Sequence, residues 1–146
     1  MSNSYQEMKS RHQAEINAFP MAFAFNERQF AEGMAKLGLT PEDTDKVYGM
    51  PGTGGFYRCE DASRFHEMFR RHEDEHKEAI AKDLTGAGYI FQMFLYELDN
   101  HEYAYTNDPE SALNALCITP EEIGDCPRLK HGFLKAHDKI RNRKEA

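Results

Sequence analysis

The stretch that decides the fold is Asp61–Lys82, DASRFHEMFRRHEDEHKEAIAK, in which two histidines occupy positions that a helix normally fills with apolar side chains. One set of residues recurs along it at intervals of three and four: Phe65, Phe69, His72, His76 and Ile80. Such spacing puts side chains on one face of an α-helix, and that face usually packs against the core. The stretch therefore predicts a long helix whose inward stripe carries two imidazoles.

The next apolar run, GYIFQMFLYELDNHEYAY at 88–105, predicts a second helix with the same anomaly. Its inward stripe contains two polar residues among apolar ones: Ile90, Phe94, Glu97 and His101. The break between the helices, DLTGAG at 83–88, is short, and short connections join antiparallel neighbours. With a turn near Thr85, residue i of the first helix lies opposite roughly residue 170 − i of the second. We therefore expect four side chains to form one polar layer: His72, His76, Glu97 and His101.

Three interpretations of this layer are open. Three imidazoles and a carboxylate are a ligand set that suits zinc, or else iron or manganese. The same four side chains also form a buried hydrogen-bonded network if neighbouring tyrosines complete it. A third interpretation is that the stripe is an exposed binding surface. Within the first helix, HEDEH resembles the HExxH pattern of zinc hydrolases, with Glu73 as general base. A metal-binding protein or metal-dependent hydrolase is thus one candidate function.

The rest of the chain predicts a mainly α fold. The Gly-rich segment KVYGMPGTGGFYRC at 46–59 is typical of a small β-hairpin. Asn26 with Gln29, and Thr119 with Glu122, have the spacing of residues that cap helix N-termini. We expect a single helical domain over 1–146, with a central antiparallel helical hairpin, a small β-hairpin, and disordered ends at 1–3 and 144–146.

Composition points to a cytoplasmic protein. No apolar run approaches the roughly 20 residues that cross a bilayer, and the N-terminus lacks the apolar core of a secretory signal. Three cysteines, an odd number without CxxC spacing, are typical of reduced thiols: Cys59, Cys117 and Cys126.

Charge is unevenly distributed along the chain. The net charge is −7, with +5 on residues 128–146 and −12 on the preceding 127. An acidic body repels nucleic acid and favours a partner protein with a basic surface. The basic C-terminal segment either contacts phosphates or is a solvated helix end, where cations are favourable.

Several segments together resemble a known family. GMAKLGL at 33–39 and ELDNHEY at 97–103 carry the resemblance most strongly, and it extends over about residues 5–140. The chain resembles small acidic proteins of phages, prophages and other mobile elements of gut Firmicutes, a family without an assigned biochemical activity. The resemblance implies equivalents of His72, Glu97 and His101 in that family.

The resemblance also implies a function. Small acidic proteins of mobile elements often bind and inhibit a host defence nuclease, and anti-CRISPR proteins are among them. The expectation is a non-enzymatic inhibitor in the bacterial cytoplasm that blocks the nucleic-acid site of a Cas nuclease. A different hypothesis is a regulatory phage protein that forms a homodimer through its aromatic helices.

Overall fold

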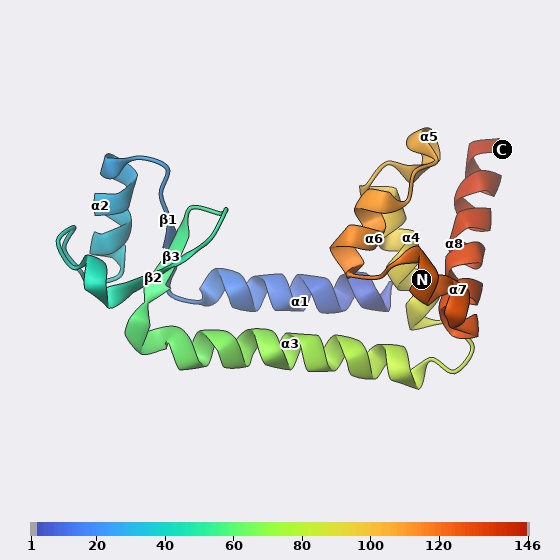
Figure 1. Cartoon of the computed structure of the whole chain (residues 1–146), viewed down its shortest axis with the longest axis horizontal. Helices are drawn as coiled ribbons and strands as arrows, with labels where there is room; N and C mark the ends of the chain where they lie inside the picture. The colour runs from blue at the N-terminus through green and yellow to red at the C-terminus, as the bar shows by residue number, and fades with distance from the viewer. Residues whose placement is uncertain (1–2, 146) are drawn as a thin grey trace. The chain divides into compact units, whose positions relative to one another are not determined.

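The computed structural model describes residues 3–145, with only the backbone at 144 and 145. This part of the chain contains eight α-helices and one small antiparallel sheet (Figure 1). The predicted fold class, mainly α with a β-hairpin, is confirmed. No helix of the described residues is long and apolar enough to cross a membrane.

The described residues divide into two compact units. Unit 2 is His12–Asp74, and unit 1 contains the described residues of Met1–Arg11 and Glu75–Ala146. Two helices, α1 (Ser4–Ala18) and α3 (Ala62–Lys82), each contribute a segment to both units. The assignment of the chain to a single domain stays a prediction, and each unit is described by itself below.

Unit 2 is a three-stranded sheet with helices on its faces. The sheet has the order β1-β3-β2, with both pairs antiparallel, so the predicted hairpin of β2 and β3 is confirmed and a third strand joins it. The third strand comes from the segment MAFAF at 21–25. The elements between α1 and α3 are β1 (Met21–Phe23), α2 (Glu27–Lys36), a 3₁₀ turn (Thr44–Lys46), β2 (Val47–Met50), β3 (Gly55–Arg58) and a second 3₁₀ turn (Cys59–Asp61).

The two faces of the sheet bury different clusters. Helix α2 packs Met34 against Ala22 and Phe56 on one face. It approaches closely because Gly33 has no side chain; a Cβ there would lie 2.7 Å from the Phe56 ring. On the other face, Met21 and Tyr57 pack with an aromatic residue of α3, Phe65.

Acidic and amide side chains near the helix starts of unit 2 have different roles. The Asn26 side chain accepts a hydrogen bond from Gln29 N–H, 2.8 Å away, as expected of an N-cap. The buried carboxylate of Asp61, just before α3, accepts hydrogen bonds from Arg58 and Arg64, because two guanidinium groups lie three residues away on either side.

Unit 1 is built around the helix that follows the DLTGAG turn. Four of its side chains are fully buried: Ile90, Met93, Phe94 and Leu98. Unit 1 contains α4 (Tyr89–Asn100), α5 (Tyr103–Thr106), α6 (Glu110–Leu116), α7 (Pro120–Asp125) and α8 (Pro127–Glu145). The predicted capping box of Thr119 and Glu122 at the start of α7 is confirmed.

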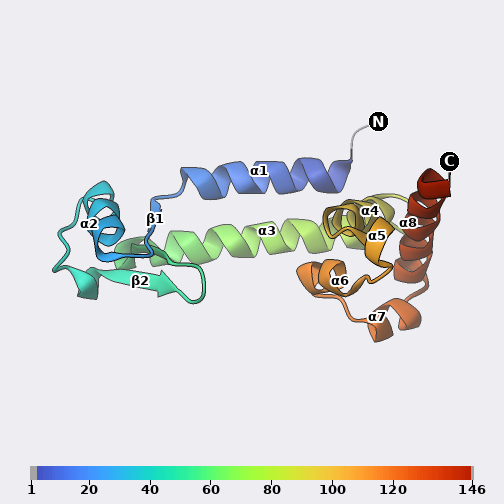
Figure 2. The same ribbon diagram turned by 90° about the horizontal axis from the view of Figure 1, so that it is seen from above.

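Helix α4 packs along α8 and also contacts α5 and α6. Helices α4 and α8 run in the same direction (Figures 1 and 2): Gly132 lies against Ile90 near their starts, and Arg143 bonds Asp99 near their ends. The segments of α1 and α3 that belong to each unit lie side by side and antiparallel (Figure 2). Helix α1 is therefore the neighbour of α3 in both units.

The predicted disorder at the two ends falls partly on residues 1, 2 and 146, which lie outside the described residues. Disorder at the ends stays a prediction, and the described end residues have the following contacts and backbone. Asn3 donates a hydrogen bond to the Gln92 carbonyl at 3.0 Å and accepts one from Gln6 N–H at 2.9 Å. The backbone of residues 144 and 145 continues α8.

Candidate functional site

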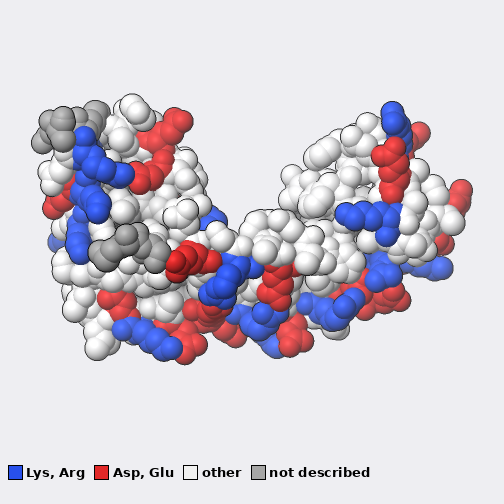
Figure 3. Space-filling model, turned by 180° about the vertical axis from the view of Figure 1, so that it is seen from behind, with Lys and Arg blue, Asp and Glu red and all other residues white. Residues whose placement is uncertain are grey.

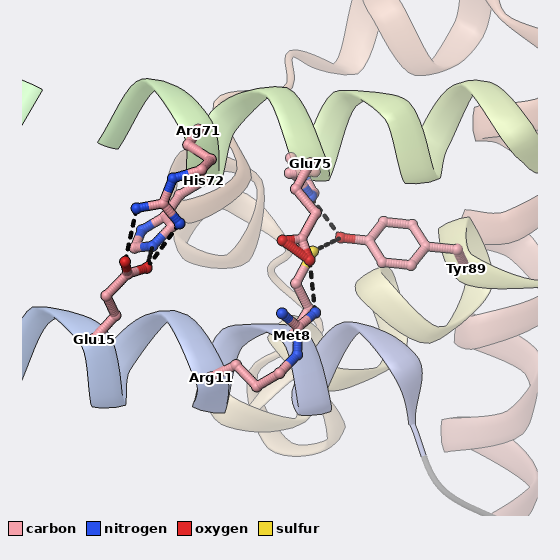
Figure 4. Close-up of polar contacts among 8 residues, drawn as sticks. Met8, Arg11, Glu15, Arg71, His72, Glu75 and Tyr89 are labelled. Atoms are coloured by element: carbon pink, nitrogen blue, oxygen red, sulfur yellow. Dashed lines mark hydrogen bonds and ion pairs between the residues drawn. The ribbon is translucent and has the colours of Figure 1, made fainter. Parts of the chain in front are cut away.

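In unit 2, His72 belongs to a cluster built on a carboxylate of α1. Its Nε2 lies 2.6 Å from Glu15 Oε1, and the guanidinium of Arg71 holds both oxygens of the same carboxylate at 3.1 and 2.7 Å (Figure 4). Hydrogen bonds from Arg71 and then from His72 lower the pKa of Glu15 to about 2. Because an ionised carboxylate only accepts hydrogen bonds, Nε2 of His72 carries the proton.

The second imidazole of this cluster comes from α1. The ring of His12 stacks on that of His72, with centroids 3.8 Å apart and planes 10° from parallel. His72 is buried. The cluster thus places two imidazoles, one guanidinium and one carboxylate at the inner surface between two helical segments of unit 2.

In unit 1, His76 faces an aromatic partner. Its Nδ1 lies 2.6 Å from the hydroxyl of Tyr89, which also lies 3.9 Å from the sulfur of Met8 (Figure 4). Burial, and then the nearby charge of Glu75, raise the pKa of Tyr89. The Glu75 carboxylate is in turn held by Arg11, 2.6 Å away. Tyr89 therefore remains a neutral hydrogen-bonding group throughout the neutral pH range.

Glu97 is the most deeply buried of the four predicted residues, with 1% of it exposed. It accepts a hydrogen bond from the Tyr5 hydroxyl at 3.2 Å, and Lys9 Nζ lies 3.1 Å from its other oxygen. Lys9 Nζ also lies 5.3 Å from the centre of the Tyr96 ring. Burial, followed by the charge of Glu97, raises the pKa of Tyr5. The positive charge of Lys9 on α1 thus balances the negative charge of Glu97.

His101 lies at the C-terminal end of α4. Its Nδ1 is 2.7 Å from the main-chain carbonyl of Glu97, so its ring caps the helix end by binding the backbone. The Glu97 side chain is directed instead at Tyr5 and Lys9.

The structure does not gather the four predicted residues into one layer. His72 belongs to unit 2, and the other three belong to unit 1. There Tyr5 contacts both His76, ring to ring, and Glu97, through its hydroxyl, whereas His101 binds a main-chain carbonyl. Nowhere in residues 3–145 do three or more His, Cys, Asp or Glu side chains form a group that could hold a metal ion. The reason is that α1 lies beside α3, and α4 packs along α8. Zinc binding stays a prediction, and elemental analysis of protein purified without an affinity tag tests it.

The residues that the sequence interpretation missed are on α1. Tyr5, Lys9 and Glu15 supply partners to the predicted residues. A signal was present in the sequence. Apolar and aromatic side chains recur along α1 at intervals of three and four: Tyr5, Met8, His12 and Ile16.

A second candidate surface is the acidic part of unit 1. Residues 83–127 contain nine Asp and Glu residues and no Lys or Arg. Asp83 is not part of the surface: burial raises its pKa, but hydrogen bonds from the N–H groups of Ile90, Gly86 and Gly88 outweigh burial and hold the pKa below its ordinary value. Six of the nine are exposed and make no ion pair with a described Lys or Arg: Glu102, Asp108, Glu110, Glu121, Glu122 and Asp125. We call these six the acidic segment.

Other charged surfaces of the molecule are mixed in sign. Along the lower edge of the face drawn in Figure 3, Lys and Arg side chains alternate with Asp and Glu side chains, whereas several Lys and Arg side chains adjoin one another at its upper left (Figure 3). Elsewhere in the described residues, opposite charges form ion pairs such as Arg11–Glu75 and Arg71–Glu15. The acidic segment differs from these surfaces because the surrounding stretch, 83–127, contains no Lys or Arg.

Comparison with known proteins identifies the family. No curated protein and no solved structure matches the chain. One family model, described as a family of unknown function, DUF7659, matches residues 4–139. This range includes His72 and His76 with their partners, Glu97 and the acidic segment. The chain therefore belongs to the DUF7659 family of unknown function.

Proposed function

We propose that this protein is a non-enzymatic accessory protein of a phage or other mobile element. In this proposal it binds a host defence nuclease of the Cas type and blocks the nucleic-acid site. The observation that carries the proposal is the acidic segment, six exposed carboxylates over 102–125 without a compensating cation. The resemblance of the sequence to proteins of mobile elements supplies the biological setting.

The physical argument rests on charge complementarity. Surfaces that hold DNA or RNA are rich in Lys and Arg, which bind phosphates. A rigid array of carboxylates attracts the same surfaces and speeds the encounter with them. The acidic segment lies on and between short helices: Thr119 and Glu122 cap each other at the start of α7, and Glu110 N–H donates a hydrogen bond to Asp108 just before α6.

The test is inhibition of a purified Cas9-type nuclease loaded with guide RNA. The protein is expected to reduce target-DNA binding and cleavage in proportion to its concentration, and less effectively as NaCl rises from 50 to 300 mM. The variant Glu121→Lys plus Asp125→Lys should raise the half-inhibitory concentration by about tenfold or more, because two repulsive charges replace two attractive ones.

A matched control changes the same charges in unit 2. Glu42→Lys plus Asp45→Lys alters two exposed carboxylates outside the acidic segment and should inhibit as well as the unmodified protein. The proposal is contradicted if the protein neither binds Cas9-type nucleases nor changes cleavage. It is also contradicted if both double variants weaken inhibition equally, because the effect then follows net charge alone.

A further inference from the structure

The outer edge of β1 in unit 2 has main-chain groups directed away from the sheet. Strand β1 pairs only with β3, and Ala24 N–H donates to Gly54 O at 2.9 Å. Hydrogen-bonded and non-hydrogen-bonded pairs alternate in antiparallel sheets, so the N–H and C=O of Met21 and Phe23 point to the open side. No hydrogen bond within residues 3–145 involves these main-chain groups of Phe23.

The next main-chain N–H that points outward along this edge is that of Phe25, and it donates a hydrogen bond to the side chain of Gln29 at 2.8 Å. The outward main-chain groups of this edge can therefore bind a partner. An unpaired strand edge is a template for another extended chain, and proteins usually cover or block such edges. Here α2 covers the position of Phe25 and leaves that of Phe23 open.

An open groove of about 520 Å³ lies along this edge, between α1, β1 and α2. Its apolar lining includes Ile16 and Met21, and Phe23 beside it is 54% exposed. Two amide side chains of α1, Gln13 and Asn17, also line the groove. Groove and edge together offer backbone hydrogen bonds, an apolar surface for side chains, and amides that bind peptide groups.

We propose that this groove binds an extended segment of a partner polypeptide, which adds to β1 as a fourth strand. The charge of the groove indicates an acidic residue in that segment. Glu32 is held by Arg28 at 3.1 Å, whereas Lys36 on the same wall makes no ion pair with the described residues. The groove thus offers one uncompensated ammonium group. The acidic segment plays no part in this site, so the inference goes beyond the proposed function.

The experiment uses the full chain and a displayed library of random linear dodecapeptides. Enriched peptides are synthesised with a fluorescent label, and binding is measured by anisotropy. We expect enriched sequences to place an acidic residue among apolar ones. Binding should slow hydrogen exchange of the Phe23 amide, which is free of protein partners, and leave the helical circular dichroism unchanged.

Two variants with matched controls locate the site. Asn17→Trp fills the groove from an exposed position and should weaken the peptides by about tenfold or more. Lys36→Glu should weaken them by a similar factor, whereas Lys130→Glu, the same change on an exposed lysine of unit 1, should leave the affinity unchanged. Glu121→Lys plus Asp125→Lys should also bind the peptides normally, which separates this site from nuclease inhibition.

Three results would overturn the inference. The first is a selection that enriches no peptide. The second is peptide binding that Asn17→Trp leaves intact or that protects amides outside 21–25. The third is a concentration-dependent dimer in solution that Asn17→Trp converts to monomer, because a second copy of the chain would then occupy the edge.

Discussion

At the scale of single residues, the two inward histidines of α3 are tolerated because each has a dedicated partner. His72 donates to an ionised carboxylate, Glu15, and His76 meets the hydroxyl of Tyr89. A buried polar group without such a partner costs about 1–3 kcal/mol. In the described part of the chain, no buried side-chain nitrogen or oxygen lacks a hydrogen-bond partner. The polar residues of this stripe therefore occupy positions at which α1 or α4 supplies a specific hydrogen-bonding partner.

Glu15 gives a prediction about acid stability. Its pKa in the folded protein is about 2, below the ordinary value of 4.5. A carboxylate whose pKa is lower in the folded protein than in the unfolded chain stabilises the fold fully at any pH well above its unfolded-state pKa. This contribution is lost as the pH falls from about 4.5 to about 2. Glu15→Gln should therefore lower the melting temperature at pH 7, and its melting temperature should converge with that of the unmodified protein near pH 2.

The measurement is thermal unfolding by circular dichroism from pH 2 to 7. Glu7→Gln changes the other acidic residue of α1, which is exposed, and serves as the control. Its melting temperature should follow that of the unmodified protein at every pH. A constant difference between Glu15→Gln and the unmodified protein down to pH 2 would show that Glu15 acts through packing and not through its charge.

At the scale of elements, the sequence predicts where helices begin and end better than which helices touch. Caps are local, so Asn26 and Thr119 identified two helix starts correctly. Pairing depends on long-range packing, and the four-residue layer was inferred from a short turn alone. That turn is closed by Asp83, whose carboxylate binds several backbone N–H groups, and by Arg128, which donates to the carbonyls of Ile80 and Asp83. These contacts direct α4 toward α8.

The contact between α4 and α8 gives a prediction with a matched control. A Cβ at Gly132 would lie 2.7 Å from the Gly86 carbonyl and 2.6 Å from an Ile90 methyl group. Gly132→Ala should therefore cost about 1–3 kcal/mol in overpacking, more than its gain in helix propensity of about 1 kcal/mol. Gly124→Ala in α7 meets nothing within 4 Å and should be neutral or stabilising.

Chemical denaturation of both variants measures the two free energies of unfolding. The opposite ordering, with Gly132→Ala the more stable, would mean that α4 and α8 separate easily. The structural account of unit 1 depends on their close approach, because Ala136 and Ile140 of α8 are buried in the same cluster as Phe94 and Leu98 of α4.

At the scale of the whole molecule, composition predicted the class of fold and the sign of the charge. It did not identify the acidic segment, although the absence of Lys and Arg from 83–127 is visible in the sequence. The division into two units was not predicted either. It follows from α1 and α3, long helices that each place different residues in the two cores: α1 contributes Tyr5 to one cluster and Ile16 to another.

This shared use of α1 and α3 gives a test of the single-domain prediction. Helices fold cooperatively because nucleation is costly, so a helix that crosses both units should couple their unfolding. Tyr5→Ala removes a buried side chain of unit 1 and should cost about 3 kcal/mol or more. If the chain is one domain, native-state hydrogen exchange should then accelerate for the most protected amides of β3 in unit 2 as well as those of α4. Tyr105→Ala, at an 82% exposed position, should change neither set. If only the α4 amides accelerate, the units unfold independently, and the chain contains two domains that share α1 and α3.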